Sequence, residues 1–264
     1  MSLQPLRNRR ALITGSTGGL GLAMAWALAR AGCDLMLNGI EIPAEFAATC
    51  RQIADEAGVK VCCTEADLSA SDEVLKLVEA ARDALGGVDI LINNAVVRHF
   101  APIVDFPTDK WEAALAVNLS AAFHAIRSVL PGMRERNFGR IFNMTSVYSQ
   151  RGATDRVDYV TTKAALLGLT RAVALENLDY DVTCHSICPG SVRTPGTEQR
   201  IAKMMLEESI DRPTAESRFL EGKQPGGQFV RPESVASLIV FLCGPAARDM
   251  TGAFMPVEAG WLAS

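Results

Sequence analysis

The stretch ALITGSTGGLGLAMAWALARAG, residues 11–32, sets the expectation for the fold. Its first residues, 11–14, form a short apolar run that predicts a buried strand ending at the glycine loop TGSTGGLG (14–21). Residues 20–31 are mostly helix formers, and Gly32 follows them at the position of a helix end. A glycine loop between a strand and a helix lets the backbone approach an anionic group, and the helix directs its first N–H groups at that group.

Strand-like and helix-like segments alternate along the rest of the chain. Short apolar runs typical of buried strands occur at residues 11–14, 33–38, 59–67, 88–95, 139–146, 182–190 and 252–257. Helix-forming stretches occur at residues 20–31, 43–57, 71–85, 108–136, 158–178 and 232–243. We expect Ser71 to cap its helix and Pro131 to interrupt the long one. The alternation predicts an α/β fold, with a parallel sheet covered on both faces, in a single domain over 1–264.

The segment 191–230 departs from this regularity. It contains scattered charges, Pro213 and the glycines of QPGGQ (224–228). Long irregular stretches in compact domains often carry function. We therefore expect this segment to cover a substrate site as a lid.

Composition narrows the classes of function. The 264 residues are 48% hydrophobic and 21% charged, with a net charge of −4 and no long run of Lys or Arg. Neither nucleic acid nor an anionic membrane surface is therefore an expected partner. No uninterrupted apolar run reaches the roughly 18 residues of a membrane helix. The N-terminal MSLQPLRNRR does not read as a signal peptide, so we expect a cytoplasmic protein.

Seven cysteines are scattered through the predicted strands and helices. A dispersed, odd-numbered set is typical of reduced core thiols in a cytoplasmic protein. The alternative is a metal site at Cys184, His185 and Cys188. On a strand, however, His185 would face the opposite side from the two cysteines, so we expect no metal.

A second motif carries acid–base chemistry. Tyr159 and Lys163 lie four residues apart in YVTTK, so on a helix both side chains project from one face. An ammonium close to a phenol stabilises the phenolate, which allows Tyr159 to exchange a proton with a carbinol oxygen. Ser146, at the end of a predicted strand, can hydrogen-bond the same oxygen. Together with the glycine loop, this motif favours a nicotinamide-dependent oxidoreductase.

The end of the second predicted strand bears on the choice of nicotinamide cofactor. A carboxylate there binds the adenosine ribose hydroxyls, whereas a basic residue favours a ribose phosphate. This chain has Asn38-Gly39-Ile40-Glu41, with no Lys or Arg there or in the glycine loop. We therefore expect NAD rather than NADP. Asp67, at the end of the third strand, is placed either to meet the adenine or to cap a turn.

The motifs occur in one order along the chain: TGSTGGLG (14–21), NNA (93–95), Asn118, Ser146, YVTTK (159–163) and PG (189–190). In this order they resemble the classical short-chain dehydrogenase/reductase family over nearly the whole length. The resemblance implies a single-domain Rossmann fold with a doubly wound, seven-stranded parallel sheet, usually in a homotetramer. It also implies a catalytic tetrad of Asn118, Ser146, Tyr159 and Lys163. In this tetrad Lys163 would hold the nicotinamide ribose, and Asn118 would hold a water of the proton relay.

The loop, the strand ends and the resemblance together predict the residues that contact the cofactor. They are Gly15, Thr17, Gly19, Leu20, Gly21, Asn38, Asp67, Leu68, Asn94, Ala95, Tyr159, Lys163, Pro189, Gly190, Val192 and Thr194. One departure from the family is Val96, where a glycine is usual. We expect Val96 to narrow the cavity without preventing binding, because the backbone supplies the contacts there.

Further stretches resemble the NAD-dependent 3-hydroxybutyrate dehydrogenases of this family, among them LNGIE (37–41), GVDILINNA (87–95), GRIFNMTSV (139–147) and residues 241–264. The likeness fails where that subfamily binds the carboxylate of its substrate with a Gln, a His, a Lys and a second Gln. The aligned residues here are Arg98, Tyr148, Arg156 and Arg200.

These replacements have a physical interpretation. Arginine binds carboxylates, sulfonates and phosphates through a planar fork, and Ser191, in place of a tryptophan, enlarges the pocket. Together with Ser146, the four aligned residues are expected to bind a hydroxy acid larger or more anionic than 3-hydroxybutyrate. Alternatively, some of the arginines face solvent or pair with Asp155, Asp158 or Asp211.

The expected activity is reversible hydride transfer between NAD(H) and a secondary alcohol. A 3-oxoacyl thioester reductase and a sugar or cyclic-alcohol dehydrogenase, using NADP(H), share the tetrad and remain alternatives. An alternative of another class is a non-catalytic, dinucleotide-binding regulator. The presence of both Tyr159 and Lys163 argues against that class.

Overall fold

A parallel sheet of seven strands forms the centre of the computed structural model, which describes residues 4–264. The strands are β1 (Arg10–Ile13), β2 (Asp34–Gly39), β3 (Val61–Glu65), β4 (Ile90–Asn93), β5 (Gly139–Met144), β6 (Val182–Pro189) and β7 (Phe254–Val257). Their order is β3-β2-β1-β4-β5-β6-β7, and every neighbouring pair is parallel. The predicted doubly wound, seven-stranded α/β fold is confirmed. The strand order reverses between β1 and β4, where such sheets open a crevice.

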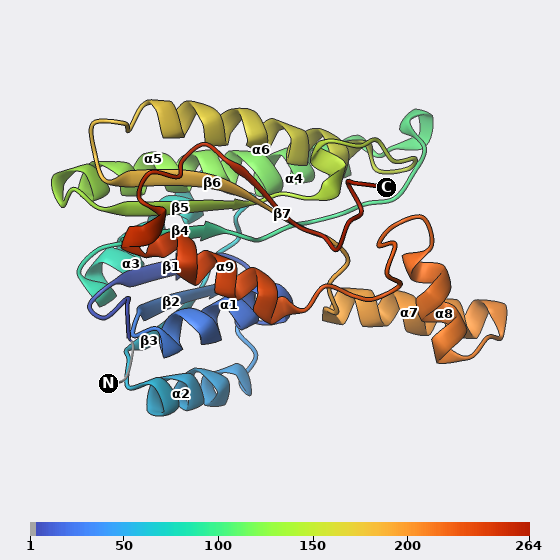
Figure 1. The fold of residues 1–264 in the computed structure, drawn as a ribbon, viewed down its shortest axis with the longest axis horizontal. Coiled ribbons are helices and arrows are strands. Elements are labelled where there is room, and N and C mark those ends of the chain that lie inside the picture. The colour runs from blue at the N-terminus through green and yellow to red at the C-terminus, as the bar shows by residue number, and fades with distance from the viewer. Residues whose placement is uncertain (1–3) are drawn as a thin grey trace.

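Helices cover both faces of the sheet (Figure 1). They are α1 (Gly19–Arg30), α2 (Phe46–Ala57), α3 (Ser71–Leu85), α4 (Thr108–Leu115), α5 (Ala121–Glu135), α6 (Val157–Leu175), α7 (Pro195–Glu208), α8 (Arg212–Leu220) and α9 (Pro232–Cys243). One hydrophobic core lies between the sheet and α1, α2 and α9, and a second lies between the sheet and α3, α5 and α6. Strands β4 and β5 are buried along their whole length, which explains why their sequences do not alternate between apolar and polar residues.

Two expectations about helix ends need correction. Ser71 does not cap α3, because the helix begins at Ser71 itself and Ala70 precedes it at the cap position without a side-chain hydrogen bond. Pro131 does not interrupt the long helix but lies inside α5. A proline removes a single backbone donor, and the buried face around Ile126 and Val129 holds the helix against the sheet. The irregular stretch is instead the π-helical segment Ala116–Ser120, between α4 and α5.

The segment 191–230 is more regular than expected, because it contains α7 and α8. Each helix begins with a capping residue and an early proline. The hydroxyl of Thr194 accepts a hydrogen bond from the backbone N–H of Thr197, and the carboxylate of Asp211 accepts one from that of Thr214. Figure 1 shows this helix pair, in orange, projecting from one end of the layered body.

One helical run within the described residues, Thr108–Glu135, is long and apolar enough by composition to cross a membrane, with a mean hydropathy of 1.4. It includes α4, the π-helical segment and α5. Its apolar residues at 121, 125, 126 and 129 are buried in the second core, against the sheet. The run is therefore a packed helix of the α/β layers.

At the end of the sheet opposite the carboxyl ends of its strands, one buried carboxylate joins several elements. Asp89 is 1% exposed, and its oxygens lie 2.7 Å from Nε of Arg10 and 3.1 Å from Nε of Arg136. Arg10 is the first residue of β1, and Arg136 follows the last residue of α5. Breaking a buried pair leaves an uncompensated charge, which is strongly destabilising.

We predict that Asp89→Asn lowers the free energy of unfolding by about 3 kcal/mol, because two partly buried guanidinium groups lose the buried carboxylate that balances their charge. Urea denaturation measures the change. Asp72→Asn is the matched control, since Asp72 pairs with Lys76 on the open surface of α3, and it should leave stability unchanged within error. Equal effects from the two substitutions would show that the Asp89 pair does not join the sheet to α5.

Candidate active site

A cavity of about 880 Å³ opens at the carboxyl ends of the central strands. All sixteen residues expected to contact the cofactor line it, and so do Ser146 and the four residues expected to bind substrate. Of the expected site residues, Asn118 alone is absent from its lining. The fold therefore brings together residues that are spread from 15 to 200 in the sequence.

The glycine loop can approach a pyrophosphate closely, because its glycines have no side chains and larger residues would not fit at these positions. Gly15 has φ +60, and a Cβ on it would lie 2.8 Å from Cα of Ala95. A Cβ on Gly21 would collide with the carbonyl oxygen of Gly15. The N-terminus of α1, at Gly19, faces the same cavity and offers unpaired N–H groups to an anion. These features match what a dinucleotide requires.

The end of the cavity that is expected to bind the adenosine contains Asn38 and Asp67, whose side chains both form hydrogen bonds with backbone groups. Asn38 is 1% exposed, and its side chain accepts from the N–H of Gly15 (3.3 Å) and donates to the carbonyl of Gly39 (3.1 Å). Asp67 accepts from the N–H of Ser69 (2.9 Å), the turn that the sequence offered as an alternative role. Asn38 therefore supports the shape of the loop, while the exposed side chain of Ile40 forms the surface beside it.

The acid–base pair lies on α6, as its spacing predicts. Tyr159 and Lys163 are both buried, and Nζ of Lys163 lies 5.7 Å from the centre of the Tyr159 ring. The same ammonium donates to the carbonyl of Met144, at 2.6 Å, just before Ser146. Burial, with a smaller effect from the charge of Arg98, lowers the pKa of Lys163 to about 7.

A guanidinium contacts the phenol directly. Arg98 donates from Nη2 to the hydroxyl of Tyr159 at 3.2 Å, and its Cζ lies 4.6 Å from the centre of the ring. The sequence led us to expect Lys163 as the cation beside Tyr159 and Arg98 only as a contact to substrate. The loop after β4 thus brings a second positive charge to the hydroxyl of Tyr159.

Asn118 lies behind this loop, in the π-helical segment. Its side chain accepts from the N–H of Val97 (2.8 Å) and donates to the carbonyl of Val97 (3.0 Å). It also lines a small separate cavity, together with Lys163. Through Val97, Asn118 fixes the loop that carries Arg98.

A buried polar network below the site was not recognised in the sequence. Asn93 donates to Asn143 (2.8 Å), Asn143 donates to Thr170 (2.9 Å), and Ser186 donates to the same threonine hydroxyl (2.8 Å). The network connects β4, β5, α6 and β6. The polar residues inside the predicted strands could have indicated this network, since a buried polar group needs a hydrogen-bond partner.

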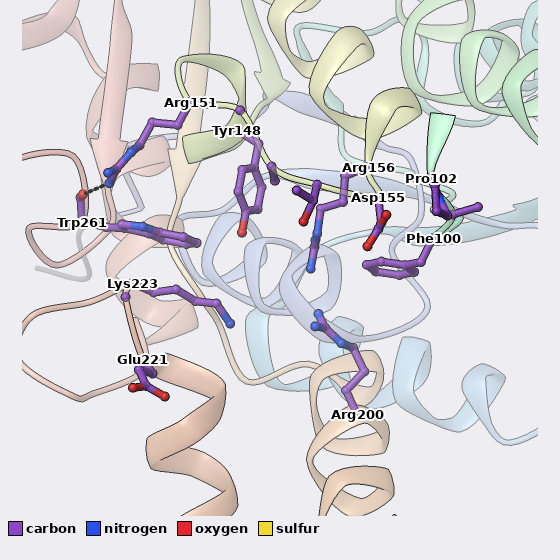
Figure 2. A pocket seen from close by; sticks show the side chains of 15 residues that line it. Phe100, Pro102, Tyr148, Arg151, Asp155, Arg156, Arg200, Glu221, Lys223 and Trp261 are labelled. Atoms are coloured by element: carbon purple, nitrogen blue, oxygen red, sulfur yellow. Dashed lines mark hydrogen bonds between the residues drawn. The ribbon is translucent and has the colours of Figure 1, made fainter. Parts of the chain in front are cut away.

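At the other end of the cavity, the arginines lie against aromatic rings. Cζ of Arg156 is 4.6 Å from the centre of the Phe100 ring and 5.1 Å from that of Tyr148, and Cζ of Arg200 is 4.9 Å from that of Phe219. Figure 2 shows these arginines beside Lys223, a lining residue that we did not identify from the sequence. Its lone position in the irregular segment gave no periodic signal.

The carboxylates proposed as alternative partners do not pair with these arginines within residues 4–264. Asp158 accepts from the backbone N–H of His99, and Asp211 caps α8. Asp155 forms no ion pair in the same range. The guanidinium groups of Arg156 and Arg200 therefore face the cavity without a counter-charge.

The buried ammonium of Lys163 predicts a pH-dependent stability. Its folded pKa of about 7 lies below the 10.5 of an exposed lysine, so above pH 7 the unfolded chain binds a proton that the folded protein lacks. The free energy of unfolding should therefore rise with pH between about pH 7 and pH 10, by up to about 1.4 kcal/mol per unit from this group. Below pH 7 both states are charged, and the full cost of burial remains.

Urea unfolding of the cofactor-free protein across this window, compared with Lys163→Met, isolates the effect. The variant should lose the part of the rise that begins near pH 7, so that its slope is lower than that of the wild type, whereas Lys203→Met, on the exposed surface of α7, should keep the wild-type slope. Parallel curves for the wild type and Lys163→Met would contradict the assignment.

Comparison with known proteins agrees with this geometry. The family model for short chain dehydrogenases matches residues 9–204. A D-beta-hydroxybutyrate dehydrogenase of Cupriavidus necator is 38% identical over 98% of this chain and 99% of its own, and one of Rhizobium meliloti is 37% identical over 97% and 99%. An L-sorbose reductase of Gluconobacter frateurii, solved with NADPH and L-sorbose, superposes with a TM-score of 0.93 at 28% identity over the whole of both chains. The chain belongs to the short-chain dehydrogenase family of oxidoreductases that act on CH–OH groups.

Proposed function

We propose that this protein is an NAD(H)-dependent dehydrogenase of a hydroxy acid larger or more anionic than 3-hydroxybutyrate. The observation that carries the proposal is the position of uncompensated guanidinium groups beside the acid–base pair. Arg98 contacts the phenol of Tyr159, and Arg156 and Arg200 line the same cavity. An anionic substrate would supply the missing negative charge.

The residues of the chain have separate tasks in the proposed reaction. A bound nicotinamide supplies the hydride acceptor in oxidation and the donor in reduction. The hydroxyl of Tyr159 exchanges the proton with the carbinol oxygen, and Ser146 hydrogen-bonds that oxygen. Arg98 donates a hydrogen bond to the hydroxyl of Tyr159, and Lys163 would hold the nicotinamide ribose. Asn118 keeps the Val97 loop in place and would hold a water of the proton relay.

The adenosine end of the cavity supports NAD over NADP. The residues beside Asn38 are Gly39 and the exposed Ile40, and the cationic residues of the lining lie at the opposite, nicotinamide end. A ribose phosphate would therefore meet an apolar side chain and no counter-charge. Measuring turnover with each cofactor tests this choice.

The substrate end supports an acid rather than a neutral sugar. The two hydroxybutyrate dehydrogenases in the comparison are named for a hydroxy acid, whereas the sorbose reductase is named for a neutral sugar. A sugar hydroxyl would leave the charges of Arg156 and Arg200 unpaired. Ser191, which lines the cavity, leaves room for a substrate longer than 3-hydroxybutyrate.

The remaining parts of the proposal concern organisation. We treat 1–264 as one catalytic domain, with 191–230 as the substrate lid, because Thr194, Arg200, Phe219 and Lys223 all line the cavity. Exposed apolar side chains, among them Phe123 on α5, support a homotetramer. Seven unpaired cysteines support a cytoplasmic location.

A panel of alcohols, assayed by nicotinamide absorbance, tests the proposed substrate class. Hydroxy acids should be oxidised with NAD, and neutral secondary alcohols of equal length at least about tenfold less efficiently in kcat/KM. Arg156→Gln should lower kcat/KM for the acids by about 10- to 100-fold, which corresponds to the loss of a charge-assisted hydrogen bond. The neutral alcohols should be unaffected.

Arg171→Gln is the matched control, because Arg171 is exposed on α6 outside the cavity lining. It should leave all rates unchanged. If neutral alcohols are turned over as well as every hydroxy acid, and Arg156→Gln does not alter that pattern, the proposed substrate class is wrong. Absence of any turnover would favour the non-catalytic alternative.

A further inference from the structure

A second chamber adjoins the cofactor cavity. It has a volume of about 630 Å³. Its walls come from the loop after β4, the turn before α6, the segment after α8 and the C-terminal turn. Residues that line both spaces are Tyr148, Arg156, Arg200, Lys223 and Trp261. A substrate with its reacting carbon beside Tyr159 can therefore extend past Tyr148 into this chamber.

Three cations converge where the two spaces meet. Figure 2 shows the guanidinium groups of Arg156 and Arg200 and the ammonium of Lys223 directed into the same volume. Two carboxylates belong to the chamber wall, Asp155 and Glu221, but neither forms an ion pair with these cations in the part of the chain that the structure describes. The cluster therefore carries a net positive charge.

Burial and the neighbouring positive charges lower the pKa values of two residues in this cluster. Burial, followed by the charges of Arg200 and Arg156, lowers the pKa of Lys223 to about 8. Burial, followed by Arg156 and Arg98, also lowers the pKa of Arg200. Both shifts disfavour the charged forms, so the cluster costs stability unless an anion enters it.

Elsewhere in the segment 191–230, arginines form ion pairs with glutamates. Arg193, before α7, lies 2.7 Å from Glu216 and 3.1 Å from Glu198, and Arg212 bonds to the same two glutamates. Arg200 and Lys223, which face the chamber, form no ion pair within the described residues, although Lys223 donates a hydrogen bond to the carbonyl of Phe219.

The number and position of the cations exceed what one carboxylate can engage. Arg98 lies at the hydroxyl of Tyr159, whereas Arg156, Arg200 and Lys223 line both the cofactor cavity and the chamber. A carboxylate has two oxygens, and a bidentate arginine occupies both. Two acid groups on one substrate would therefore engage these four cations more fully than one.

We propose that the chamber beyond Tyr148 binds a second acid group, so that the substrate is a hydroxy acid carrying two acid groups, with Lys223 as a residue that determines this specificity. The second group is a carboxylate or a phosphate monoester, and the rings of Tyr148 and Trp261 line the path of the connecting chain. This inference rests on the proposed function, because it takes the carbinol beside Tyr159 as the reacting centre.

Calorimetric binding to the NADH-bound enzyme tests the proposal apart from catalysis, because an alcohol does not react with the reduced cofactor. Three probes are compared at low ionic strength: 3-hydroxypentanoate, 3-hydroxyglutarate and 3-hydroxy-4-phosphonooxybutanoate. The first two have the same chain length and differ in the second carboxylate. We expect the two probes that carry a second acid group to bind at least about tenfold more tightly than 3-hydroxypentanoate. The tighter of the two identifies the second group as carboxylate or phosphate.

Lys223→Gln should weaken the binding of the two probes that carry a second acid group at least about tenfold more than the binding of 3-hydroxypentanoate, whose remaining binding reports that the variant is folded. Lys223→Arg should retain the preference. Lys203→Gln, on the exposed surface of α7, should retain it fully. Equal affinity for one and two acid groups in the wild type, or an undiminished preference in Lys223→Gln, would overturn the proposal. If the probes with two acid groups bind more tightly but no hydroxy acid is oxidised with NAD, the second acid-binding site is supported and the proposed function is rejected instead.

Discussion

The hydrogen bonds that join the end of β1 to the end of β4, here called the β1–β4 joint, position the rest of the site. The hydroxyl of Thr14 accepts from the backbone N–H groups of Asn94 (2.9 Å) and Ala95 (3.1 Å), and the Asn94 side chain donates to the carbonyls of Thr14 and Gly15. These bonds close the glycine loop against the end of β4, at the point where the strand order reverses. Only glycine fits at position 21, where α1 passes this joint. The cofactor loop on one side and the loop carrying Arg98 on the other both start from it.

Charge is distributed unevenly around that joint. The chain is acidic overall, and several arginines away from the cavity form ion pairs, as in the Arg10–Asp89 and Arg140–Asp181 contacts. At the substrate end, Arg156, Arg200 and Lys223 are left without counter-charges in the described residues. A cleft lined by one sign of charge attracts ligands of the opposite sign and raises their rate of association. The same concentration of charge that disfavours the free protein would thus favour an anionic substrate.

The sequence predicted those features that depend on local pattern. The alternation of apolar runs and helix formers gave the confirmed parallel sheet, and the four-residue spacing of Tyr159 and Lys163 placed both on one helix face. Features that depend on contacts between distant segments were missed. No spacing rule connects Arg98 to Tyr159 or Asn143 to Thr170, because these pairs meet only after the strands have assembled. The caps at Thr194 and Asp211 were readable local signals, and with them α7 and α8 could have been predicted.

The central claim is that Tyr159 exchanges the proton at the reacting oxygen beside a bound nicotinamide. Its most direct test is the rate of nicotinamide absorbance change in Tyr159→Phe under single-turnover conditions, with cofactor affinity measured in parallel. We expect the variant to bind NADH as the wild type does, within about twofold, while hydride transfer to or from its best hydroxy acid slows by about 10²- to 10⁴-fold. A variant that binds the cofactor and transfers hydride at the wild-type rate would contradict the central claim.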